Sequence, residues 1–99
     1  SLPSNYFGKW SEARAKYALE LDEYAQREYL ASQIHQLQKM NRNILFTVLF
    51  LLQKIVEHQD QNNMNAQNLG LALSPALGMP APMVRLLIFH KTCTEFDFQ

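Results

Sequence analysis

The chain has 99 residues, 47% of them hydrophobic, and its nine basic and nine acidic residues give a formal net charge of zero at pH 7. This length suits one small domain with a single core. Because the charges balance, the composition does not indicate a basic surface that binds the phosphate backbone of a nucleic acid, and no nucleic-acid partner is expected. The longest apolar run, Ile44 to Leu52, has about nine residues against roughly 20 for a membrane-spanning helix, so no membrane insertion is expected.

Cysteine content and sequence complexity indicate the cellular compartment and the number of domains. Cys93 is the only cysteine, so the chain has no internal disulfide. Small domains without disulfides are typical of the reducing cytosol, and we expect a cytoplasmic protein. No internal repeat, low-complexity tract or Gly/Ser linker divides the sequence, which predicts one domain over residues 1–99.

The composition predicts an all-α domain of about five helices. Leucine occurs fifteen times and glutamine nine times, against ten for valine, isoleucine and threonine together, a balance that favours helix over strand. The first helix is predicted from Ser4, with a stripe formed by Phe7, Trp10, Ala13, Tyr17 and Leu21. Asp22 is predicted to cap a second helix that ends near Leu37. Its inward stripe is Tyr24, Leu30, Ala31, Ile34 and Leu37, and its outward residues are Arg27, Glu28, Gln33 and Gln36.

A third helix, capped by Asn41 and running from Arg42 to about His58, is predicted to be the central core helix, because it is apolar on nearly every side between Ile44 and Leu52. Whether four short neighbours suffice to cover such a helix is left open by the sequence. Either an apolar patch remains and drives self-association or partner capture, or the helices repack locally.

The last two helices follow a predicted polar turn at residues 60–63. Asn65 is predicted to cap a helix that stops before Pro75 and is buried nearly all round. Pro82 fits the first turn of a final helix that extends to about Phe96. The inward residues of that helix are Val84, Leu87, Ile88 and Phe89.

Asn68 is a polar amide in the first turn of this apolar helix. An amide in that place either caps internal backbone or offers itself to a partner. Lys39 and Arg42 form a small basic spot at the turn before the third helix, either as solvated helix-end charge or as a partner contact.

Residues with enzymatic chemistry are sparse. His35, His58 and His90 lie 23 and 32 residues apart, which is not the spacing of a zinc site. Cys93 has no paired base and is interpreted as structural. The chain has no Gly-rich phosphate loop, so no cofactor is expected and any GTP belongs to a partner.

Residues 62–70 resemble the signature of Rho GTPase-activating (RhoGAP) domains, Asn-Lys-Met-Thr/Ser-x-x-Asn-Leu-Ala, which is followed by Gly-Pro or Ser-Pro. Asn63 replaces the Lys of that signature, Asn65 the hydroxyl residue and Gly70 the final Ala. Residues 37–41 are similar to the family's Leu-Pro-x-x-Asn, and residues 2–3 to the end of its Lys-x-x-Leu-Arg-x-Leu-Pro motif. In this register the chain corresponds to the later part of the domain. The family's Gly-x-x-Arg-x-Ser/Thr-Gly loop is not in this sequence.

The resemblance implies a partial RhoGAP-like helical domain over residues 1–99 that docks on the switch regions of a Rho-family small GTPase, of the Rho, Rac or Cdc42 type. Its role would be to promote GTP hydrolysis in the parent protein, as an activator rather than a hydrolase. The family's GTPase-contacting Asn falls on Asn68. Its late contacting Pro falls on Pro80 or Pro82, of which Pro82 enters the candidate set beside Lys39 and Arg42.

The arginine finger carries most of the acceleration in such domains. The arginines of this chain all lie outside the finger's motif: Arg14, Arg27, Arg42 and Arg85. No catalytic residue is therefore assigned, and the isolated chain is expected to be inactive. Two alternatives stay open: a catalytically dead GAP-like module that serves protein interaction or dimerisation, and an unrelated five-helix interaction domain.

Overall fold

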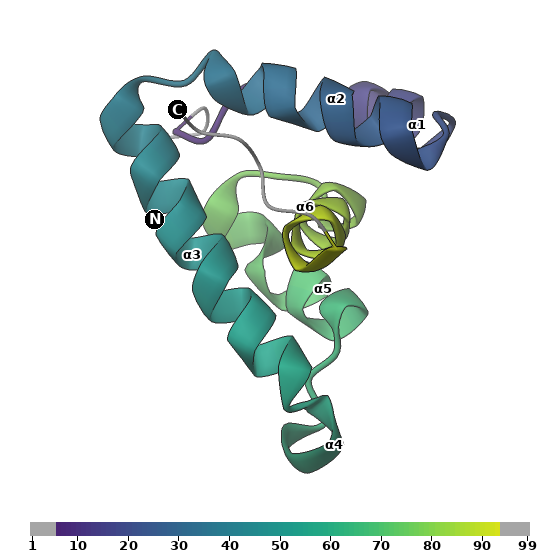
Figure 1. Cartoon of the computed structure of the whole chain (residues 1–99), viewed down its shortest axis with the longest axis vertical. Coiled ribbons are helices and arrows are strands. Elements are labelled where there is room, and N and C mark those ends of the chain that lie inside the picture. The colour runs from purple at the N-terminus through teal and green to yellow at the C-terminus, as the bar shows by residue number, and fades with distance from the viewer. Residues whose placement is uncertain (1–5, 94–99) are drawn as a thin grey trace.

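The computed structural model describes residues 6–93, with side chains described for residues 6–90. These residues form six helices: α1 (Glu12–Leu19), α2 (Glu23–His35), α3 (Lys39–Glu57), α4 (Gln59–Asn62), α5 (Ala66–Leu77) and α6 (Ala81–Cys93). Figure 1 shows α3 as one long edge, α1 and α2 lying across one end of it, and α5 and α6 inside the angle between α2 and α3. The all-α prediction is confirmed. The sixth helix, which the sequence did not predict, is the single turn α4, and it lies in the predicted polar turn.

Helix α6, and not α3, lies at the centre of the core. It packs against both α5 and α3, and most of its described side chains are buried: Met83, Val84, Leu86, Leu87, Ile88 and His90. The predicted inward positions Val84, Leu87 and Ile88 are confirmed. Phe89 is 40% exposed, so its predicted inward position is wrong. The predicted extension of this helix to Phe96 lies outside the described residues.

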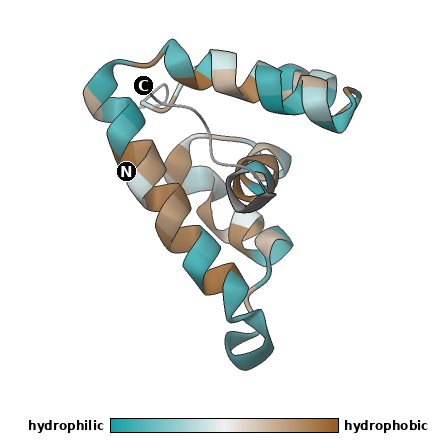
Figure 2. Cartoon of the chain, in the orientation of Figure 1, coloured by the Kyte–Doolittle hydropathy of each residue, from teal (hydrophilic) through white to brown (hydrophobic). Residues whose placement is uncertain are grey.

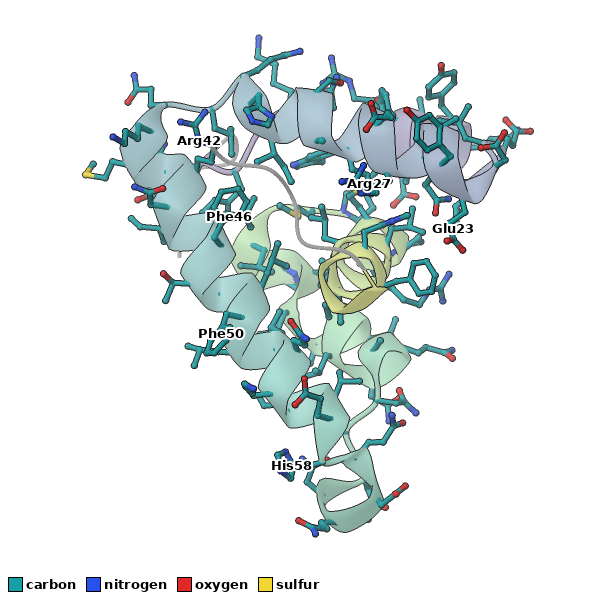
Figure 3. All side chains as sticks on the ribbon, viewed as in Figure 1. Glu23, Arg27, Arg42, Phe46, Phe50 and His58 are labelled. Carbon is teal, nitrogen blue, oxygen red and sulfur yellow. The ribbon has the colours of Figure 1, made fainter. Side chains whose placement is uncertain are left out.

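Helix α3 buries only one face, formed by Leu45, Leu49 and Leu52. The prediction of a central helix is therefore wrong, because α6 packs against one side of α3 only. Its opposite side carries exposed apolar residues, which we name the α3 apolar face: Met40, Ile44, Phe50, Leu51 and Ile55. Figure 2 shows the hydrophobic band along α3, and Figure 3 shows Phe50 on the side of α3 that points away from α6.

Side-chain caps begin α1, α2 and α5. The Oδ1 of Asp22 accepts a hydrogen bond from the backbone nitrogen of Ala25 at 2.8 Å, as the sequence predicts. The predicted cap at Asn41 is wrong, because α3 already begins at Lys39 and no side chain caps it. Asn41 instead donates its Nδ2 hydrogen to the carbonyl of Tyr6 at 3.3 Å. It thus ties the N-terminal segment to α3.

Helix α1 begins at Glu12, capped by Ser11, rather than at Ser4. The described part of the preceding segment is not helical, and Gly8 has a φ of 108°, a conformation that side chains disfavour. The predicted stripe along one helix is also wrong, because Phe7 and Trp10 precede α1 and Tyr17 is 53% exposed, although Phe7 itself is buried. On α2, Tyr24 is 72% exposed against the predicted inward position, whereas Leu30 and Ile34 are buried as predicted.

A buried polar pair joins α6 to the arm formed by α1 and α2. The His90 side chain donates from Nε2 to Oε1 of Gln26 at 2.8 Å, and Gln26 donates from Nε2 to the carbonyl of Ala18 at 2.9 Å. Both side chains are buried. Burial lowers the pKa of His90, Glu23 opposes that shift, and Arg27 adds to it. The neutral imidazole is therefore the form that this core favours.

Within the described residues, no single helix is both long and apolar enough to cross a membrane. Helices α5 and α6 reach the length and apolar composition of a membrane span only when taken together, and the two helices are bent by 116° relative to each other.

Leu49→Ala should lower the free energy of unfolding by about 2 to 5 kcal/mol, because it leaves a cavity in the core. The matched variant Leu51→Ala, on the exposed side of the same helix, should change it by no more than about 0.5 kcal/mol. Urea unfolding followed by circular dichroism measures both. Equal losses for the two variants would contradict the one-sided burial of α3.

The free energy of unfolding should fall as the pH drops below about 6.5, the ordinary pKa of histidine. Below that pH, His90 of the unfolded chain binds a proton, whereas His90 of the folded chain stays neutral until the pH reaches its lowered pKa. The contribution of neutral His90 to folding stability is therefore complete above about pH 6.5 and is lost as the pH falls below it. Urea unfolding between about pH 7.5 and pH 5.5 tests this. In the His90→Gln variant the free energy of unfolding should depend less on pH, since the variant and the unmutated chain share the other two histidines. An unchanged pH dependence of the free energy of unfolding would refute the assignment to His90.

Candidate functional site

Helix α5 presents one face to solvent, contrary to the prediction that it is buried nearly all round. It buries Leu69, Gly70 and Leu77. The opposite face consists of exposed residues, which we name the Asn68 face: Gln67, Asn68, Leu71, Ala72, Pro75 and Ala76. Leu71 has 62% of its surface exposed. The face is thus mostly apolar, with two carboxamides at its N-terminal end.

Pro75 lies inside α5 and does not end it, which corrects the predicted boundary. The ring stands on the exposed side of α5, and the amide hydrogen that proline lacks would have bonded the carbonyl of Leu71. The helix ends at Leu77, and Gly78 follows in a left-handed conformation with a φ of 67°. The Ser74 hydroxyl donates to the carbonyl of Met79 and ties the helix end to the next turn.

The side chain of Asn68 is not a helix cap. Asn65 performs that role, since its Oδ1 accepts the backbone hydrogen of Asn68 at 2.8 Å. The predicted cap at Asn65 is confirmed. The carboxamide of Asn68 makes no hydrogen bond to any described residue. Both of its donors and its acceptor are exposed on the surface of α5, available to a partner.

Gly70 brings the start of α6 against α5. A Cβ at Gly70 would lie 2.9 Å from the carbonyl oxygen of Ala81, closer than side-chain carbons approach backbone. This crossing forms a hollow of about 140 Å³, which we name the Arg85 hollow, lined by Gln67, Leu71, Ala81, Pro82 and Arg85. Pro82 therefore borders the Asn68 face. Arg85 was not predicted as a site residue, although its spacing of three from Pro82 places both on one side of a helix.

Lys39 and Arg42 lie in the first turn of α3, which is about 28 Å long. Helix α5 follows the opposite end of α3, so the basic spot is remote from Asn68. Lys39 lines a shallow hollow of about 510 Å³ with Met40, Asn43, Ile44 and Thr47. Arg42 is half-buried, and its buried Nε has no hydrogen-bond partner within the described part of the chain. Figure 3 shows Arg42 near the junction of α2 and α3.

The described residues contain no group of three His, Cys, Asp or Glu side chains that could hold a metal ion. The predicted structural role of Cys93 lies outside the described side chains. The candidate site consists of exposed carboxamides, apolar side chains and an arginine at the crossing of α5 and α6.

Comparison with known families identifies the domain. The RhoGAP domain model matches residues 1–82 of the chain. The chain belongs to the RhoGAP domain family. The matched segment includes Asn68 and ends at Pro82, so Arg85 lies three residues beyond it. At the level of the family, the role is Rho GTPase activation by an all-helical domain.

Curated relatives cover parts of the chain. RalA-binding protein 1 of Drosophila melanogaster is 34% identical over 74 residues, which is 75% of this chain and 12% of that protein. Rho GTPase-activating protein 29 of Bos taurus and that of Homo sapiens are each 37% identical over 49 residues, which is 50% of this chain and 4% of those proteins. This RhoGAP chain thus spans a small fraction of each relative. No solved structure matches it.

Proposed function

We propose that this chain supplies the docking surface of a RhoGAP domain, and that the Asn68 face binds the switch regions of a Rho-family small GTPase. The carboxamide of Asn68 carries this proposal, because it is exposed and has no hydrogen-bond partner among the described residues while Asn65 caps the helix. It offers two donors and one acceptor to the backbone of an irregular loop, without a charge to desolvate. Its neighbours on α5 are apolar and exclude water from such a contact.

Pro82 completes the central part of the proposed interface, since it borders the Asn68 face through the Arg85 hollow. Lys39 and Arg42 are proposed as outer contacts. A standard interface of about 800 Å² per partner is roughly 30 Å across, which is comparable with the length of α3. An interface of that size reaches about 15 Å from its centre, so contact with Lys39 and Arg42 requires an interface centred between the Asn68 face and the first turn of α3.

The proposed activity belongs to the parent protein, in the cytoplasm, with residues 1–99 as the later part of its RhoGAP domain. An arginine finger supplied from elsewhere in the parent would stabilise the developing phosphate charge, which is worth about 10³ to 10⁵ in turnover. The chain's own contribution is to hold the switch regions in place. The chain acts as a regulator of a hydrolase and not as a hydrolase itself.

Asn68→Ala should weaken binding of the chain to a Rho-family GTPase by about 1 to 3 kcal/mol, because GTPase groups left without the carboxamide lose their hydrogen bonds. Titration calorimetry with the GTPase bound to a non-hydrolysable GTP analogue measures the loss. Urea unfolding of the same variant should show little change, since the side chain makes no hydrogen bond to the described residues.

Asn65→Ala is the matched control. It removes the cap of the same helix and should lower stability by about 1 kcal/mol while it leaves the Asn68 carboxamide in place. The proposal predicts opposite patterns for the two variants: lost affinity for Asn68→Ala, and lost stability for Asn65→Ala. Unchanged affinity in Asn68→Ala would remove the central contact from the proposed function.

The isolated chain should not accelerate GTP hydrolysis appreciably, even when it binds the GTPase, because no arginine here occupies the finger's motif. Single-turnover hydrolysis compares this chain with a longer segment of the parent protein that includes the arginine loop. If the isolated chain raises the rate by about 10³ or more, one of its own arginines acts as the finger. Arg42 and Arg85 would then be substituted first.

The α3 apolar face favours a second candidate function, a GAP-like module that associates with itself or with another protein. Five large apolar side chains exposed along one helix form the kind of patch that marks interaction sites. We propose that two copies pair through this face. Sedimentation of the chain over a range of concentrations should show dimers that Leu51→Ala weakens, and a monomer at all concentrations would count against this candidate.

A further inference from the structure

Arg85 lies at the edge of the Asn68 face. It is exposed, stands one helical turn after Pro82, and lines the Arg85 hollow together with Gln67 and Leu71. Its backbone nitrogen lies 3.8 Å from the position that a Cβ at Gly70 would occupy. The crossing of α5 and α6 therefore fixes the start of this side chain against α5.

The charge of Arg85 is not neutralised by the described residues. Its guanidinium takes part in none of their hydrogen bonds or ion pairs. A second hollow, of about 390 Å³, lies beside Arg85 and is lined by Glu23, Gln26, Leu86 and Phe89. Glu23 shares this hollow, yet no ion pair joins it to Arg85. Arg85 thus lines two hollows, and none of its five donors bonds a described residue.

A planar guanidinium with free donors binds carboxylates in a bidentate manner. We propose that Arg85 binds a surface carboxylate of the GTPase that docks on the Asn68 face, and that this ion pair helps to select among Rho-family GTPases. The inference rests on the proposed function. Charged groups at the rim of an interface act mainly on specificity and on the association rate, and Arg85 stands at the rim of this face.

Arg42, the basic candidate from the sequence, is less suited to this role. It lies at the far end of α3 from α5, and its Nε is buried. Arg27 is engaged with Glu28 at 3.0 Å, and Figure 3 shows Arg27 between α2 and α6. Of these three arginines, Arg85 is the one whose position borders both Pro82 and the exposed side of α5.

The test is titration of the full 99-residue chain against a panel of Rho-family GTPases bound to a non-hydrolysable GTP analogue, at low and at high salt. Arg85→Ala should raise the Kd for the tightest-binding GTPase by about tenfold and should make the Kd less dependent on salt. Arg85→Lys should recover part of the affinity, because it keeps the charge and loses the fork geometry. The size of the loss should differ among the GTPases.

Arg14→Ala is the matched control, since Arg14 is an exposed arginine on α1 that bonds Gln33; its Kd should stay within about twofold. If Arg85→Ala binds as tightly as the unmutated chain while Asn68→Ala is weakened, the Arg85 contact is overturned and the proposed function stands. If neither substitution changes binding, or the chain binds no GTPase of the panel, both the Arg85 contact and the proposed function are overturned. Circular dichroism of each variant shows that the helices are intact.

Discussion

The close approach of two backbones at Gly70 and Ala81 is the constraint on which the rest of the structure depends. A methyl group at Gly70 would lie 2.9 Å from the Ala81 carbonyl, and a backbone atom cannot move aside as a flexible side chain can. Glycine inside a helix costs about 1 kcal/mol relative to alanine, so the packing of α5 on α6 must offset that cost. The RhoGAP signature has Ala at this position. Glycine at this position lets α5 and α6 approach closely, and α6 supplies more of the buried hydrophobic side chains than any other described helix.

Local signals in the sequence predicted the starts of α2 and α5 correctly but not those of α1 and α3, and they did not predict which helix is central. Asp22 and Asn65 cap their helices as expected, because capping depends on neighbouring backbone alone. Apolar content did not predict which helix is central. Helix α3 is the more continuous apolar run, yet α6 is the helix with neighbours on several sides, and coverage by neighbours cannot be read from one helix's sequence.

The candidate site was predictable only in part. The motif singles out Asn68, and its exposed carboxamide fits a recognition role. The exposure of its apolar neighbours was missed, because Leu71 and Ala72 suggest burial by residue type alone. Arg85 was missed for another reason: its position beside α5 depends on the tertiary crossing at Gly70. The positions of Lys39 and Asn68 relative to each other also depend on tertiary structure, because Lys39 begins α3 and Asn68 lies on α5, which follows the other end of α3 in the chain.

Pro75 removes one backbone hydrogen bond from α5, on the side that we propose to bind a GTPase. Proline has no amide hydrogen, so the carbonyl of Leu71 lacks the helical bond that residue 75 would otherwise donate. Leu71 lies on the Asn68 face, one turn beyond the carboxamide of Asn68. The face thus combines side-chain hydrogen-bonding groups at its N-terminal end with a residue that has no main-chain donor near its C-terminal end. Any residue other than proline at position 75 would restore that donor to the helix, on the side where we propose that a partner docks.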